Sequence, residues 1–97
     1  MAKYGIINQF KGGTSKQYDA TVAKVHRDGG KSLPVGQTYH AAGPTGDGWA
    51  VVAIWDSKET WEKFRDETLV PTLMSMDGGL PGPPSEVAFD MHSEMTR

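Results

Sequence analysis

Cysteine is absent from this sequence of 97 residues, which excludes disulfides, thiolate nucleophiles and cysteine-ligated metal sites. The sequence also lacks a basic run: ten Lys and Arg stand against twelve Asp and Glu, for a formal net charge of −2. We therefore expect no nucleic-acid partner, because binding to a phosphate backbone needs a positively charged surface. No apolar stretch approaches the roughly 20 residues that span a bilayer, and the N-terminal residues show no cleavable leader pattern. We expect no membrane contact and a cytoplasmic protein, a compartment that suits a chain without cysteine.

The sequence does contain an alternation of strand and helix patterns, within a length that suits one domain, residues 1–97. Strands are predicted at Tyr4 to Phe10, Gln37 to Ala42, Trp49 to Trp55 and Glu86 to His92, and helices at Ser15 to Arg27 and Ser57 to Leu69. This βαββαβ order predicts an α+β, ferredoxin-like sandwich, in which a four-stranded antiparallel sheet carries both helices on one face.

Capping and breaking residues mark the ends of the two predicted helices. Thr14 or Ser15 is suited to cap the first helix. Asp56 and Glu59 have the spacing of a capping box at the start of the second helix. Pro71 predicts a break near its preceding residue, because proline has no N–H to continue the helical hydrogen bonds.

Both faces of the third predicted strand are apolar. Trp49, Val51, Ala53 and Trp55 alternate with Ala50, Val52 and Ile54. Two helices cover only one face of such a sheet, so the other face needs a different cover. We expect a homodimer that packs sheet against sheet and closes an α+β barrel.

Two segments, YGIINQF with its polar Asn8 and VVAIWDSKETWEKF at the junction of the third strand and the second helix, resemble the dimeric α+β barrel superfamily. Within it, the chain resembles the antibiotic biosynthesis monooxygenase group. The resemblance implies dimerisation through the sheets and a pocket between sheet and helices in each subunit. It also implies no bound cofactor if the chain follows the branch that oxidises polycyclic phenols directly with oxygen.

The haem-degrading branch of the same superfamily has an Asn in the first strand, a Trp on the long helix and an iron-binding His. Asn8 matches the first of these residues. Phe64 and Met74 stand where the Trp and the His would be, so the resemblance does not extend to haem degradation.

Candidate site residues follow from chemistry and from this resemblance. His40 is the candidate general base, because an imidazole titrates near neutral pH. Asn8 and Tyr39 are candidate hydrogen-bond donors, and Trp61, Phe64 and Trp49 are candidate walls of a substrate pocket. Alternative interpretations are that a neighbouring backbone group pairs with Asn8 and that His40 faces solvent. The three histidines have no metal-ligand spacing, so no metal site is predicted.

Two functional classes are compatible with these observations. The first is a cofactor-independent, monooxygenase-like enzyme that acts on a bulky aromatic or lipophilic compound. The second is a non-catalytic dimeric barrel that binds a hydrophobic ligand or acts as a stress-related or regulatory partner. The orientation of Asn8 and His40 would distinguish them, since convergent polar groups are needed for catalysis but not for binding.

Overall fold

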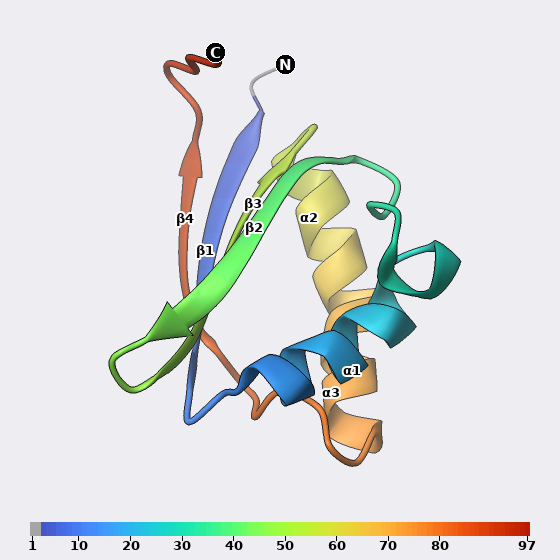
Figure 1. Ribbon diagram of the computed structural model, residues 1–97. Coiled ribbons are helices and arrows are strands. Elements are labelled where there is room, and N and C mark those ends of the chain that lie inside the picture. Colours follow the sequence, from blue (N-terminus) through green and yellow to red (C-terminus); the bar gives the residue numbers. More distant parts are fainter. Residues whose placement is uncertain (1–2) are drawn as a thin grey trace.

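One antiparallel sheet with the strand order β2-β3-β1-β4 forms the frame of the computed structural model, which describes residues 3–97 (Figure 1). The strands are β1 (Tyr4–Lys11), β2 (Gln37–Thr45), β3 (Gly48–Trp55) and β4 (Ser85–Asp90). The helices are α1 (Ser15–Val25), α2 (Lys58–Phe64) and α3 (Val70–Ser75), with a short 3₁₀ turn, η1 (Asp28–Gly30), and a π-helical segment, η2 (Arg65–Leu69). All three α-helices lie on the same side of the sheet (Figure 1).

The prediction of an α+β fold with a four-stranded antiparallel sheet is confirmed. The strand order and the βαββαβ connections are consistent with the ferredoxin-like sandwich. The predicted bounds are close, with β2 extending to Thr45, β4 ending at Asp90 and α1 ending at Val25. Across the described residues, none of the helices is both long enough and apolar enough to traverse a lipid bilayer.

Hydroxyl side chains begin both long helices. Thr14 caps α1 in a capping box, because its Oγ1 accepts from the Gln17 N–H and the Gln17 side chain accepts from the Thr14 N–H. At α2 the predicted capping box of Asp56 and Glu59 is wrong, since Ser57 Oγ accepts the Thr60 N–H at 3.2 Å. The N–H of Asp56 instead donates to Gly36 O at 2.8 Å, so this residue still continues the strand pairing.

The predicted break near Pro71 takes a different form, because the backbone stays helical from α2 through α3. The Val70 N–H donates to the Arg65 carbonyl, five residues back, which defines the wide turn η2. This change of register comes directly before Pro71, where a regular α-helix would need the N–H that proline lacks.

The core lies between the sheet and the helices and is rich in aromatic side chains. Its buried members are Ile6, Val25, Ala53, Trp55, Trp61 and Leu69. The Trp55 ring is fully buried and lies 5.7 Å from the Trp61 centroid and 4.9 Å from that of Phe64. Offset aromatic pairs at such spacings are rigid, so this cluster fixes α2 against the sheet.

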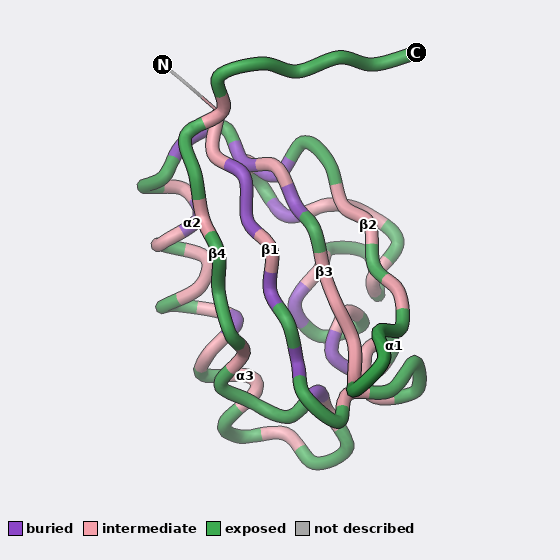
Figure 2. The backbone as a smooth tube through the Cα atoms, turned by 90° about the vertical axis from the view of Figure 1, so that its left-hand side faces the viewer, coloured by how far each residue is buried: buried purple, intermediate pink, exposed green. Residues whose placement is uncertain are grey.

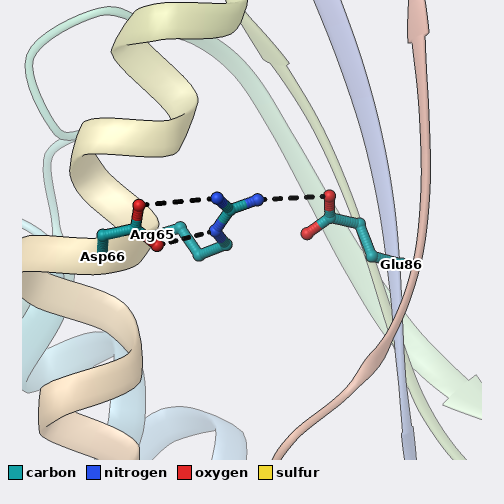
Figure 3. Close-up of polar contacts among 3 residues, drawn as sticks. All are labelled: Arg65, Asp66 and Glu86. Atoms are coloured by element: carbon teal, nitrogen blue, oxygen red, sulfur yellow. Dashed lines mark hydrogen bonds and ion pairs between the residues drawn. The ribbon is translucent and has the colours of Figure 1, made fainter.

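Arg65 links the helical layer to the edge strand β4 (Figure 3). Its Nε donates to Asp66 Oδ1 at 2.9 Å, and its Nη1 lies 3.6 Å from Glu86 Oε2. Its guanidinium carbon also lies 6.0 Å from the centroid of the Trp61 ring. These partly exposed ion pairs contribute modestly to stability, but they hold η2 beside the first residues of β4.

Within residues 3–97, no helix covers the opposite face of the sheet, and apolar side chains are exposed there. Figure 2 looks onto this side, where β4 is exposed along most of its length. Phe89 is 48 % exposed, and its ring lies over Gly5, where a Cβ would collide with it. Tyr39, Val52 and Val87 are also exposed. We call Tyr39, Val52, Val87 and Phe89 the open face.

Candidate functional site

The inner face of the sheet, α1 and α2 enclose a cavity whose walls are largely apolar. Its enclosed volume is about 50 Å³, and about 480 Å³ of empty space is present when its mouth is included. The enclosed part alone has room for a few water molecules. The aromatic residues Trp61 and Phe64 line it, and the polar side chains at its wall are Asn8, Tyr18, Thr21, His26, Gln37 and His40.

Asn8 faces this cavity from the middle of β1. It lies on the inner face with Ile6 and Phe10 and is 5 % exposed. Its Oδ1 has no hydrogen-bond partner among the described residues. A buried polar atom of this kind usually bonds to water or to a ligand, because leaving it unpaired costs free energy.

His40 faces the same cavity from the edge strand β2, and both of its ring nitrogens have partners. Nε2 lies 2.6 Å from Tyr18 Oη, and Nδ1 lies 2.9 Å from Gln37 Oε1. The ring of His26, at the end of α1, meets the His40 ring edge to face with centroids 4.6 Å apart. Three side chains therefore contact one imidazole: Tyr18 from α1, His26 from the C-terminal cap of α1 and Gln37 from β2.

An irregularity in β2 makes the contact between Gln37 and His40 possible. Residues three apart on a regular strand point to opposite faces of the sheet. The register of β2 against β3 shifts between Gln37 and Tyr39, so Gln37 and His40 both face the cavity. Bulges often redirect side chains beside functional sites, and this one gives the imidazole a second partner.

Desolvation dominates the electrostatics of this cluster. Burial, with a further contribution from neighbouring His26, lowers the pKa of His40 from 6.5 to about 4. Burial also lowers the pKa of His26. Burial, followed by the charge of Asp19, raises the pKa of Tyr18. At neutral pH, His40 is therefore a neutral imidazole and Tyr18 a neutral phenol.

The structure brings four of the six predicted site residues to the cavity. Asn8, His40, Trp61 and Phe64 line it. Trp49 lies beside it, with its ring 5.3 Å from Tyr18. Tyr39 does not reach the cavity: it pairs with Ile54 on the other side of the sheet and is 51 % exposed. Tyr39 and His40 are neighbours on one strand, so their side chains point to opposite faces, and His40 takes the inward position.

Sequence reasoning missed Tyr18, Gln37 and His26 as partners of His40. In the sequence Tyr18, Val22 and Val25 are spaced i, i+4 and i+7, which forms one stripe along the helix, and His26 follows at its end. The periodicity of α1 already placed Tyr18 on the sheet-facing side, so its hydroxyl could have been considered as a polar group aimed at β2. No sequence signal reveals Gln37, because the bulge that turns it inward depends on strand pairing.

The sequence expectations also concern the positions of possible metal-ligating side chains. No group of three or more His, Asp or Glu residues that could hold an ion occurs within residues 3–97. At the two positions compared with the haem-degrading branch, Phe64 belongs to the aromatic core and Met74 is 82 % exposed.

No protein-family model matches the chain, and no curated protein has a significantly similar sequence. The fold and the site therefore define the class of protein by themselves. It is an α+β domain with an apolar, aromatic cavity between a four-stranded antiparallel sheet and its helices. One wall of this cavity carries an unpaired amide oxygen, and another carries a hydrogen-bonded Tyr–His–Gln cluster.

Proposed function

We propose that this chain binds a bulky aromatic or lipophilic compound with a hydroxyl group and oxidises it as a cofactor-independent, monooxygenase-like enzyme. The observation that carries the proposal is the convergence of unpaired Asn8 Oδ1 and the neutral His40 on one largely apolar cavity. Apolar walls with a few convergent polar groups and a perturbed titratable group are typical of binding and active sites.

The spacing of these groups suits a ligand of ring size. Asn8 pairs with Val51 and His40 with Ala53, so their Cα atoms are two strands and two residues apart. That separation corresponds to about 12 Å before the side chains reach inward. An aromatic ring held by Trp61 and Phe64 would span this separation once the cavity widens.

The proposed reaction starts with proton transfer from the ligand hydroxyl to the His40 cluster. In the oxidation of an anthrone, the enol hydroxyl loses this proton and the resulting anion reduces oxygen. The ring methylene carbon loses two hydrogens and gains one oxygen atom from O₂, while the other oxygen leaves as water. The protein's contributions are to exclude bulk water, orient the ring and stabilise the anion by hydrogen bonds.

A pKa of about 4 makes His40 a weak base in the empty cavity. An anionic ligand beside the ring favours the imidazolium and raises this pKa, because opposite charges stabilise each other in a poorly solvated site. The same low value supports a second candidate function, a dimeric barrel that binds a hydrophobic ligand without turnover. The enclosed volume also requires the cavity to widen at its mouth for a polycyclic ligand in either case.

We further propose that the protein is a homodimer that covers the open face. Three of the open-face residues are apolar and lie on one sheet face, with Val52 on β3 and Val87 and Phe89 on β4, on either side of β1. Packing against the same face of a second copy would remove them from water, in a self-complementary interface. Native mass spectrometry should give about twice the 10.5 kDa of the chain.

The test of the enzymatic function combines binding with oxygen uptake, using 1,8-dihydroxyanthrone as the probe. Quenching of tryptophan fluorescence reports binding, and an oxygen electrode reports turnover. Asn8→Ala should lower turnover, whereas Gln9→Ala, an exposed neighbour on the other face of β1, should not. Binding without oxygen uptake above the uncatalysed rate would favour the non-catalytic alternative, and absence of binding would refute both.

A further inference from the structure

We propose that Tyr18, and not His40, is the residue that contacts the ligand hydroxyl, and that Tyr18 passes the proton on to His40. This inference rests on the function proposed above and assigns the proton path within the same cavity. Tyr18 lines the cavity from α1, on the wall opposite the sheet.

The hydrogen bonds of His40 determine the direction of the path. Gln37 Oε1 is a carbonyl oxygen that can only accept, so Nδ1, at 2.9 Å, must carry the hydrogen. In a neutral imidazole, Nε2 is then the acceptor, and it receives the Tyr18 O–H at 2.6 Å. The lone pair that a base would use is therefore already occupied by Tyr18.

Tyr18 has the free acceptor capacity that His40 lacks. A phenol oxygen that donates its hydrogen can still accept from another hydroxyl. A ligand hydroxyl can therefore donate to Tyr18 Oη while Tyr18 donates to His40 Nε2. Burial and the neighbouring Asp19 raise the pKa of Tyr18, so the phenol stays protonated before and after the transfer.

The relay moves two protons, one to Tyr18 and one from it, so the net change is one proton transferred from the ligand to His40. The ligand O–H bond breaks and its proton binds Tyr18 Oη, while the original Tyr18 proton moves to His40 Nε2. The products are a ligand oxyanion, a neutral Tyr18 and a His40 imidazolium that still donates through Nδ1 to Gln37. The re-formed Tyr18 O–H then donates to the oxyanion, so one group both relays the proton and stabilises the charge.

The surroundings of His40 decide how far this transfer proceeds. His26 meets the His40 ring directly, and a charge on either ring disfavours a charge on the other. Asp19 acts on Tyr18 from the same helix. His26 is expected to stay neutral at neutral pH, because burial lowers its pKa, and it therefore permits a charge on His40.

The first test follows the proton without any ligand. In ¹⁵N NMR of the whole protein, His40 should be the Nδ1–H tautomer, with Nε2 hydrogen-bonded. In Tyr18→Phe the Nε2 resonance should move to that of an acceptor nitrogen without a hydrogen bond, since the variant lacks the hydroxyl that donates to it. An Nε2–H tautomer in the wild type, or an unchanged Nε2 resonance in Tyr18→Phe, would overturn the inference.

The second test uses 4-nitrophenol, which absorbs visible light as the phenolate but not as the phenol. The ratio of bound phenolate to bound phenol should fall about tenfold in Tyr18→Phe, the effect expected for one lost hydrogen bond to a charged oxygen. Tyr39→Phe removes the same atom from the open face and should leave the ratio unchanged.

The outcomes separate the two proposals. Equal ratios in the wild type and Tyr18→Phe, with 4-nitrophenol bound to both, would refute the role of Tyr18 and leave the binding function intact. An equal loss in Tyr39→Phe would also refute the role of Tyr18, because the effect would then not come from the cavity. A wild type that binds neither this probe nor 1,8-dihydroxyanthrone would refute the proposed function and the relay together.

Discussion

Replacing Thr21 by Val should destabilise the protein more than replacing it by Ser. Thr21 is 2 % exposed on α1, and its Oγ1 accepts the buried N–H of Leu80 at 2.9 Å across 59 positions of the sequence. It also donates to Gln17 O at 2.9 Å. Val has nearly the same shape but no acceptor, so the Leu80 N–H is left buried and unpaired. This loss should cost about 1 to 3 kcal/mol.

The Ser variant keeps the oxygen and removes one buried methyl group, at a cost of about 1 kcal/mol. Thermal unfolding followed by circular dichroism measures the difference, since about 1 kcal/mol corresponds to roughly 4 to 8 °C in Tm for a domain of this size. We expect Thr21→Val to unfold roughly 4 to 24 °C below the wild type, and Thr21→Ser between the two. A Thr21→Val variant as stable as the wild type, or more stable than Thr21→Ser, would show that packing of the methyl group and not the hydrogen bond holds Leu80 in place.

Three further outcomes are expected. The wild type should lose stability as the pH falls from 6.5 to about 4, because the pKa of His40 is lower in the native protein than in the unfolded chain. The unfolded chain therefore binds a proton in this pH range before the native protein does. The loss is on the order of 2 kcal/mol after allowance for partial exposure; urea titrations should show it reduced in His40→Gln but not in His92→Gln. Phe89→Arg should convert the proposed dimer to a monomer in native mass spectrometry, and an unchanged dimer would place the interface elsewhere. Ser57→Ala removes the cap of α2 and should cost about 1 kcal/mol in urea denaturation, whereas no change would mean that water satisfies the Thr60 N–H equally well.

Most of the fold could be predicted because its signals are local. The alternation in Trp49 to Trp55 and the stripe of Tyr18, Val22 and Val25 each follow from the period of one element. The capping residue of α2 was harder to predict, since Asp56 and Ser57 both offer an acceptor oxygen. The backbone hydrogen bond from Asp56 to Gly36 decides between them.

The candidate site was less predictable because it depends on contacts between elements. The mixed polarity of β1 left the direction of Asn8 open, and the packing of Ile6 and Phe10 against the core resolves it. Tyr39 was expected in the site and Gln37 was not, although a regular strand would place them on the same face. Because a bulge lies between them, Gln37 faces the cavity and Tyr39 faces the other side of the sheet. The position of the bulge follows from the pairing of β2 with β3.

The π-helical segment η2 has a consequence for how this domain tolerates changes in length. Each residue added to a helix rotates everything beyond it by about 100°. The wide turn over Arg65–Leu69 holds one residue more than an α-helical turn would, so an extra residue is accommodated there without a loop. Deleting one residue from this turn would let an ordinary α-helix form while α2 and α3 keep their directions, so only side chains within Arg65–Leu69 would turn. Leu69, which is buried in the core, would then face a different neighbour. The length of this helix is thus tied to the shape of the cavity that Leu69 helps to line.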